Sequence, residues 1–123
     1  MNELKIQTEL VLNCRRLGGY GMKMQNKHIA GVPDLLLSLP HTGAVIVEVK
    51  VKGGALTPLQ KLTIQSMRNG GIKTGWAIVE YIGNGNAVVW AGNDVDNFGI
   101  KGNSMAKERG GNWPIEYIIN ACK

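Results

Sequence analysis

Apolar residues recur at helical spacing in three stretches of the chain. This periodicity predicts helices over residues 3–17, 58–69 and 113–122. The first of these helices carries an apolar stripe of Ile6, Leu10, Cys14 and Leu17. We expect it to end at Gly18, where two consecutive glycines interrupt the pattern.

Between these helices the pattern changes to short runs rich in β-branched and aromatic residues. We expect strands over residues 20–29, 34–39, 44–52, 74–82 and 86–91. Residues 40–43 and 83–85 are turns short enough to make two antiparallel hairpins. Helical and strand segments interleave along the chain, which predicts a single α/β domain over residues 1–123, with a central mixed sheet flanked by helices. Residues 92–112 are rich in glycine, asparagine and basic residues, and we expect a flexible basic loop there.

Charged residues interrupt two of the expected strands. Side chains two residues apart in a strand share a face, so Glu48 and Lys50 project together while the valines between and beside them form the opposite, core face. In a hairpin of residues 34–39 and 44–52, Asp34 falls at the same end as Glu48 and Lys50. Burying a charge without a partner is costly, so these three groups need solvent, one another or a cation.

Two interpretations fit these three residues. Two carboxylates that meet repel each other unless a proton or a cation lies between them, and Mg²⁺ is bound in proteins by one or two carboxylates and water. A lysine beside such an ion can orient or deprotonate the water that attacks a phosphate. Alternatively, Glu48 and Lys50 form an exposed strand pair, and Asp34 caps the turn after Pro33. The first interpretation predicts a phosphodiesterase.

Composition limits the partners and the setting of the protein. The chain has 123 residues and a formal net charge of +5, which suits a polyanion such as nucleic acid. Cys14 and Cys122 lack the spacing of a zinc site, and we expect both to be buried free thiols. No apolar run is long enough to span a membrane, and the first residues lack a secretory pattern. We therefore expect a soluble, cytoplasmic protein.

The segments around the charged residues resemble a known nuclease family. The pair Pro33-Asp34 followed by the triplet Glu48-Val49-Lys50 matches the PD-(D/E)XK motif. The longer strings GVPDLLL, VEVK and LTPLQ are similar to the VRR-NUC branch of that superfamily, and the resemblance covers about residues 3–80. It implies a restriction-endonuclease-like fold, similar to that of Holliday-junction resolvases.

The resemblance also implies a metal-dependent DNA endonuclease. It implies that Asp34 and Glu48 hold Mg²⁺ or Mn²⁺, that the carbonyl of Val49 completes the shell, and that Lys50 assists the attacking water. It further implies a homodimer that cuts branched or structured DNA, such as a junction or a flap. The second hypothesis is a catalytically silent nuclease fold that serves as a DNA-binding or assembly module. Since none of the acidic and lysine positions is missing, the enzyme is favoured.

The family carries an acidic residue on its first helix, and two residues here are candidates. Glu3 lies on the same stripe as the apolar residues of the first helix, whereas Glu9 points away from it. We expect Glu3 to belong to the site and Glu9 to be a solvated surface charge. Glu3 also suits the positive end of the helix dipole, which is a structural alternative.

A glutamine and three lysines complete the candidate set. Gln60 matches a glutamine near the family's active site, and it is also spaced to form a capping box with Thr57; the two roles are compatible. Asp34 and Glu48 together are called the acidic pair below. Lys23, Lys27 and Lys52 lie close to this pair in sequence and are candidates for DNA phosphate contacts. The alternative for each lysine is a solvated surface charge.

Overall fold

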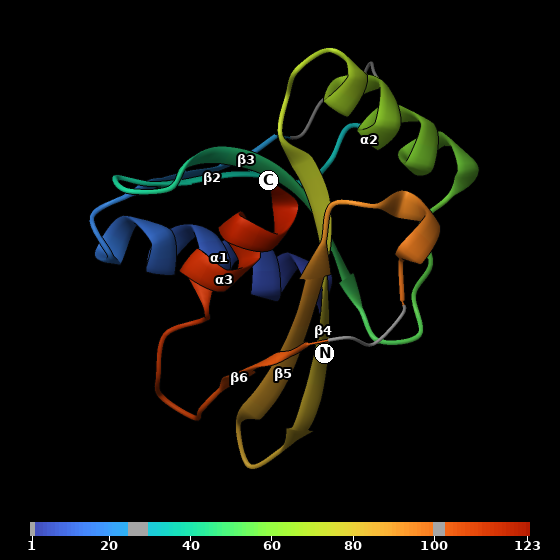
Figure 1. Ribbon diagram of the computed structural model, residues 1–123. Helices are drawn as coiled ribbons and strands as arrows, with labels where there is room; N and C mark the ends of the chain where they lie inside the picture. Colours follow the sequence, from blue (N-terminus) through green and yellow to red (C-terminus); the bar gives the residue numbers. More distant parts are fainter. Residues whose placement is uncertain (1, 25–29, 100–102) are drawn as a thin grey trace.

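A mixed six-stranded sheet forms the centre of the computed structural model, which describes residues 2–24, 30–99 and 103–123 (Figure 1). The strands are β1 (Tyr20–Lys23), β2 (Leu35–Leu39), β3 (Gly43–Val51), β4 (Thr74–Gly83), β5 (Asn86–Gly92) and β6 (Met105–Lys107). They lie in the sheet in the order of the sequence, β3 and β4 pair in parallel, and the other neighbours are antiparallel. The expected α/β fold with one mixed sheet is confirmed.

Helices cover both faces of the sheet (Figure 1). The helices are α1 (Glu3–Arg16), α2 (Pro58–Asn69) and α3 (Ile115–Cys122), with a short 3₁₀ helix η1 (Val95–Asn97). α1 and α3 pack on one face, whereas α2, which connects the parallel strands β3 and β4, packs with η1 on the other. None of these helices, within the described ranges, has the length and apolar character to cross a membrane.

The first helix forms largely as its pattern predicts. Asn2 caps it by accepting hydrogen bonds from the backbone N–H groups of Leu4 and Lys5, at 2.8 and 3.3 Å. The stripe residues Ile6, Leu10 and Cys14 are fully buried. The prediction for Leu17 is wrong: it is the C-cap residue and is 44% exposed. The helix ends at Arg16, so the side chain beyond it no longer follows the stripe.

The main core lies between the sheet and the helices α1 and α3. From β3 it receives the valine face, with Val45, Val47 and Val49 buried, and the opposite face of the strand carries the charged residues as expected. Cys14 and Cys122 are buried free thiols in this core, which confirms that prediction. A second, smaller core lies under α2 and η1 and consists of Leu56, Ile64, Trp76, Ile78 and Val95.

Both predicted hairpins are present. β2 and β3 pair with Leu35 opposite Val47 and Leu39 opposite Gly43, so the turn closes at residues 40–42. β4 and β5 are joined at Asn84 and Gly85, whose φ angles of 55° and 80° are left-handed. Asparagine followed by glycine suits this conformation, because both tolerate positive φ better than other residues do.

The expectation of one loop over residues 92–112 is wrong in its described part. Asp94 caps η1 by accepting a hydrogen bond from the N–H of Asp96, and its carbonyl accepts one from Trp76 Nε1 at 3.0 Å. Further along, β6 adds to the edge of the sheet by pairing with β5. A three-residue strand leaves no periodic signal in the sequence, and its position depends on the strand beside it.

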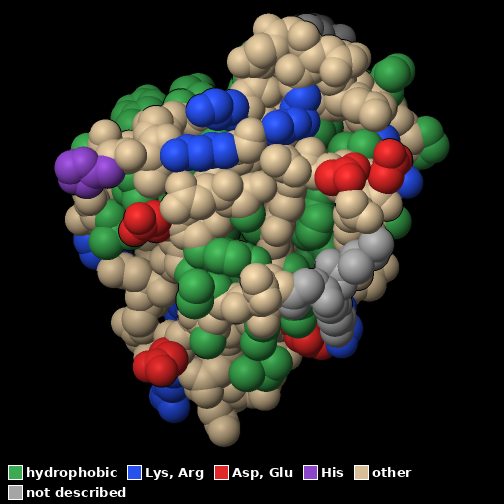
Figure 2. All heavy atoms as spheres, viewed as in Figure 1, with side chains coloured by type: hydrophobic (Ala, Val, Ile, Leu, Met, Phe, Trp, Pro, Cys, Tyr) green, Lys and Arg blue, Asp and Glu red, His purple; other side chains and the backbone are tan. Residues whose placement is uncertain are grey.

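Arg68 of α2 ties the carboxyl end of the chain to the sheet. Its guanidinium donates hydrogen bonds to the carbonyls of Thr74, Cys122 and Lys123, at 2.8, 3.0 and 2.8 Å. These hydrogen bonds make Arg68 a structural link between α2, β4 and α3. Several basic side chains gather on the surface over this part of the molecule, near the carboxyl end of the chain that is marked in Figure 1 (Figure 2).

Candidate active site

Asp34 stands immediately before β2 and is held from both sides. Its carbonyl accepts a hydrogen bond from the N–H of Met24, and its Oδ2 accepts one from the N–H of Val49, both at 2.8 Å. The second bond crosses the β2–β3 hairpin, so the Asp34 carboxylate is held at Val49, the residue next to Glu48. A charge-assisted bond of this kind is stronger than one between neutral groups and orients the acid.

Glu48 lies on the face of β3 that turns toward α2, and the residue is only 3% exposed. Its Oε2 accepts a hydrogen bond from Gln60 Nε2 at 3.3 Å and lies 3.7 Å from Lys50 Nζ. Its Oε1 is buried and has no hydrogen-bond partner among the described residues. An unsatisfied buried carboxylate oxygen is costly, and a proton or a bound cation would relieve that cost.

The surroundings of Glu48 change its pKa strongly. The pKa of Glu48 is raised from 4.5 to about 8: burial is the largest cause, and the nearby negative charge of Asp34 acts in the same direction. Lys50 opposes this shift, whereas the charge of Glu3 adds to it. Near neutral pH and without a cation, Glu48 is therefore largely protonated.

The two acids of α1 have different surroundings. Glu3 is half-buried in the first turn, and its charge reaches Glu48. The expectation that Glu9 is solvated is wrong: its Oε2 is buried without a hydrogen-bond partner in the described chain, and its charge raises the pKa of Tyr81, after the larger effect of burial. This side of α1 is covered by the segment before α3, since the N–H of Trp113 donates to Asn13 Oδ1 at 2.8 Å.

Gln60 has both of the geometries considered for it. Its Oε1 accepts a hydrogen bond from the N–H of Thr57 at 2.9 Å, and its own N–H donates to Thr57 Oγ1 at 3.1 Å, which completes a capping box. The amide nitrogen of the same side chain donates to Glu48. Gln60 thus stabilises the start of α2 and also donates to an oxygen of Glu48 on β3. The capping box therefore fixes the distance between the helix and the acidic pair.

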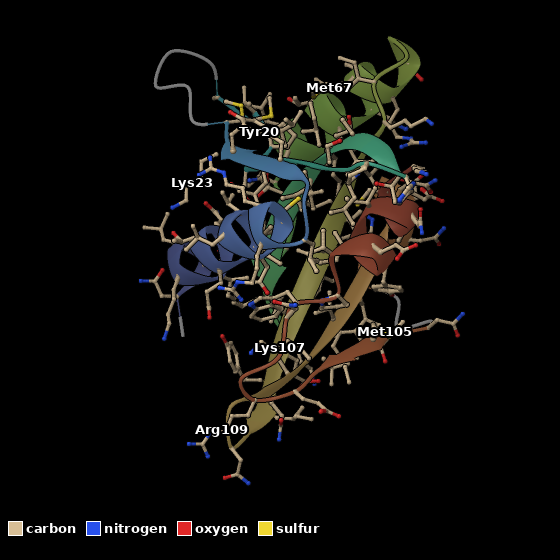
Figure 3. All side chains as sticks on the ribbon, turned by 90° about the vertical axis from the view of Figure 1, so that its left-hand side faces the viewer. Tyr20, Lys23, Met67, Met105, Lys107 and Arg109 are labelled. Atoms are coloured by element: carbon tan, nitrogen blue, oxygen red, sulfur yellow. The ribbon has the colours of Figure 1, made fainter. Side chains whose placement is uncertain are left out.

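The lysines predicted to contact DNA lie in different places. Lys23 ends β1 opposite Leu35, close in the sheet to Asp34, and Lys52 is ion-paired with Glu80. Lys27 lies outside the described residues. In Figure 3, Lys23 and Tyr20 lie on the edge strand β1, whereas Lys107 and Arg109 lie toward the other end of the view. Nζ of Lys107 is 5.4 Å from the centre of the Trp113 ring.

The N–H of Val49 is a site group that the sequence did not reveal. The sequence suggested only the carbonyl of this residue as a ligand, but its N–H holds Asp34. The hairpin register was the signal that could have found it, because it sets Leu35 opposite Val47 and so brings Asp34 close to residues 48 and 49.

The donor set can be compared with what a metal ion needs. In the part of the chain that the structure describes, no three His, Cys, Asp or Glu side chains cluster closely enough to hold an ion. Asp34 and Glu48 lie closest together at the site, and within the described chain Oε1 of Glu48 has no hydrogen-bond partner. Mg²⁺ is commonly bound by one or two carboxylates, with water in its other positions. The residues present therefore fit a hard divalent cation.

Comparison with known proteins identifies the family. The family model of the VRR-NUC domain matches residues 3–80, which include Glu3, Asp34, Glu48, Lys50 and Gln60. The chain belongs to the VRR-NUC domain family. The resemblance seen in the sequence is thus confirmed.

This VRR-NUC protein is similar to a phage protein and to a solved domain of the same family. It is 37% identical over 60 residues to "Putative nuclease p44" of Acyrthosiphon pisum secondary endosymbiont phage 1, and this match spans 49% of the chain and 64% of the phage protein. A solved VRR_NUC domain is 27% identical, with a TM-score of 0.53, over 62% of this chain and 82% of that one.

A second solved structure covers nearly the whole VRR-NUC protein. It is the Holliday junction resolvase Hjc of the archaeal hyperthermophile Archaeoglobus fulgidus, with a TM-score of 0.59 and 12% identity over 94% of this chain and 98% of the resolvase. At that identity the likeness concerns the fold. The expected restriction-endonuclease-like fold is confirmed.

Proposed function

We propose that this VRR-NUC protein is a metal-dependent DNA endonuclease that hydrolyses phosphodiester bonds. The observation that carries the proposal is the buried acidic pair: one oxygen of Glu48 has no hydrogen-bond partner among the described residues, Asp34 lies beside this glutamate, and Lys50 lies 3.7 Å from the other oxygen. A buried acidic pair does not stabilise a core, because apolar side chains of the same volume would give a more stable fold. A site that binds a cation and a phosphate requires such a pair.

The residues have distinct roles in this proposal. Asp34 and Glu48, with the carbonyl of Val49, hold Mg²⁺ or Mn²⁺, which when bound polarises a phosphoryl oxygen and acidifies a water molecule. Lys50 orients the attacking water and offsets negative charge at phosphorus. Gln60 and the N–H of Val49 keep the two carboxylates in place through their hydrogen bonds. Glu3 adds a further negative charge that favours a cation at the pair.

We further propose that the substrate is branched or structured DNA and that the protein acts as a homodimer. The net charge of +5 suits a polyanion, and Lys23 and Lys52, with Lys27, are the proposed phosphate contacts. The motifs of the family imply a junction or a flap as substrate, and the fold is like that of a Holliday junction resolvase. Exposed leucines on α2, Leu59 at 44% and Leu62 at 61%, offer apolar surface for a second copy.

Cleavage assays test the activity directly. Four-way, forked and linear DNA are incubated with the wild type, Asp34→Ala and Lys50→Ala, each with Mn²⁺ and with EDTA. We expect the wild type to cut at least one branched DNA in Mn²⁺ only, and both variants to be inactive. Equal cutting by all three proteins, or none by the wild type on any DNA, would refute the assignment. In the second case, retained binding would instead favour a silent DNA-binding module.

Metal binding has a readout that needs no DNA. Because a carboxylate must lose its proton to bind a cation, Mn²⁺ binding near neutral pH should release protons from the acidic pair. Titration calorimetry in two buffers of different ionisation enthalpy measures this release. Glu48→Gln is the matched control, since it keeps the size of the side chain and has no proton to lose. Equal proton release by both proteins contradicts the proposed ligand.

A further inference from the structure

A small cavity opens beside the acidic pair, on the face of the sheet that carries Glu48. Its volume is about 290 Å³, just below the usual range for small-ligand pockets. Its described lining consists of Lys52, Gly53, Gly54, Ile78, Trp90 and Gly99. The isoleucine and the indole ring make the walls largely apolar, and Lys52 is the one charged residue among the described lining residues.

The register of the sheet places this cavity directly next to Lys50. Lys50 is paired with Ile78 on β4, and Ile78 is paired with Trp90 on β5, so the three side chains share one face on consecutive strands. Since neighbouring strands are about 4.8 Å apart, the backbone of Trp90 lies roughly 10 Å from that of Lys50. The turn after β3 closes the gap, because a Cβ on Gly54 would lie 3.7 Å from the Cβ of Lys50.

We infer that this cavity receives an unpaired nucleobase of the DNA strand, stacked against Trp90, next to the phosphate that is cut. The inference rests on the proposed nuclease function and adds to it the class of substrate: DNA with at least one base free of its partner beside the scissile bond. Aromatic side chains bind single-stranded DNA by stacking, and a nearby cation contacts the backbone phosphate. Lys52, held at the rim by its ion pair with Glu80, is in position to supply that cation.

A larger cavity of about 430 Å³ also includes Trp90 in its wall, so it is the competing location. Its lining includes Trp76, Tyr117 and the acid Asp94, and none of its described lining residues carries a positive charge. A carboxylate there repels the phosphates on either side of a bound base. The smaller cavity, with a lysine at its rim and Lys50 beside it, fits the ligand better.

Binding to DNA that lacks single bases tests this inference without requiring cleavage. Forked DNAs with one abasic position, scanned along the unpaired strand, are titrated in EDTA against the wild type, Trp90→Leu and Trp90→Phe. We expect the wild type to bind about tenfold more weakly when the base at one or two adjacent positions is missing. Trp90→Leu, which fills space but does not stack, should lose this position dependence, whereas Trp90→Phe should retain it.

Tyr117→Phe is the control for the larger cavity. The variant removes the hydroxyl that contacts the N–H of Ala91 and the carbonyl of Asn103 at that cavity, and it leaves the smaller one unchanged. It should show the same position dependence as the wild type. The inference is wrong if no abasic position weakens wild-type binding, if Trp90→Leu keeps the dependence, or if Tyr117→Phe abolishes it. A base-dependent wild type that cuts no DNA would support the cavity while refuting the proposed hydrolysis.

Discussion

Val47 and Glu48 are neighbours on β3, but their side chains enter different surroundings. Val47 is fully buried against α1 and α3, and Glu48, at 3% exposure, is hidden almost as well on the α2 side. The side chain of Val47 packs in the hydrophobic core and has no polar atom that requires a hydrogen bond. One oxygen of the glutamate accepts a hydrogen bond from Gln60, and the other has no partner in the part of the chain that the structure describes. Burial alone therefore does not separate core from site; the unsatisfied polar atom does.

The rest of β3 repeats this difference. Val45 and Val49 continue the core face, while Lys50 continues the polar face and lies next to the apolar cavity. A stable fold requires the first face, and the second lowers stability unless a ligand is bound. Substitutions on the two faces should therefore separate activity from stability.

The largest expected effect is on activity. Glu48→Gln keeps the shape of the side chain but removes the charge that we propose binds the metal, so cleavage should fall about 1,000-fold or more. Near neutral pH the metal-free variant should be about as stable as the wild type, because Glu48 is then protonated; above about pH 8 it should be more stable, because the repulsion between Glu48 and Asp34 is removed. Single-turnover cleavage and thermal unfolding measure the two effects. Activity within tenfold of the wild type would exclude Glu48 from the site.

Stability should also depend on pH through the same residue. The pKa of Glu48 rises from 4.5 to about 8 on folding, so the folded state holds this proton more tightly than the unfolded state. Metal-free protein should therefore lose stability as pH rises from about 4.5 to about 8, by a few kcal/mol in all, and then level off. Urea unfolding across this window measures the loss. Glu48→Gln should lack this component, and an unchanged slope would contradict the assignment.

The sequence predicted the helices and hairpins because their signals are local. Three members of the α1 stripe, the capping box at Thr57 and the Asn84-Gly85 turn depend on residues a few positions apart. The gathering of Asp34, Glu48 and Lys50 also followed from one short hairpin. The family motif added Gln60, whose contact with Glu48 spans only twelve residues.

The features that were missed depend on contacts distant in sequence. Glu9 is covered because the segment at Trp113 docks on α1, a hydrogen bond across 100 residues. β6 forms because β5 offers an open edge, and not because of its own three residues. The cavity beside Lys50 needs β4, β5 and the turn after β3 together. No periodicity or spacing in the sequence records such arrangements.

On the core face, Val47→Ala should act on stability alone. Removing two buried methyl groups leaves a small cavity, which should lower the free energy of unfolding by about 2 kcal/mol. Cleavage below the melting temperature should stay within a factor of about two, because the side chain points away from the acidic pair. Denaturant unfolding and the cleavage assay on the same preparation test this. A large loss of activity in a folded variant would show that the two faces are coupled.

The smallest expected effects concern Gln60, which both caps α2 and contacts Glu48. Thr57→Ala removes one half of the capping box and should cost about 1 kcal/mol of stability, while the contact between Gln60 and Glu48 remains. Gln60→Ala should cost a similar amount and should also lower cleavage about tenfold, because an oxygen of Glu48 loses its donor. Unfolding free energies and the dependence of cleavage rate on Mn²⁺ concentration separate the two roles. If Thr57→Ala weakens the response to Mn²⁺ as much as Gln60→Ala does, Gln60 acts only by starting the helix.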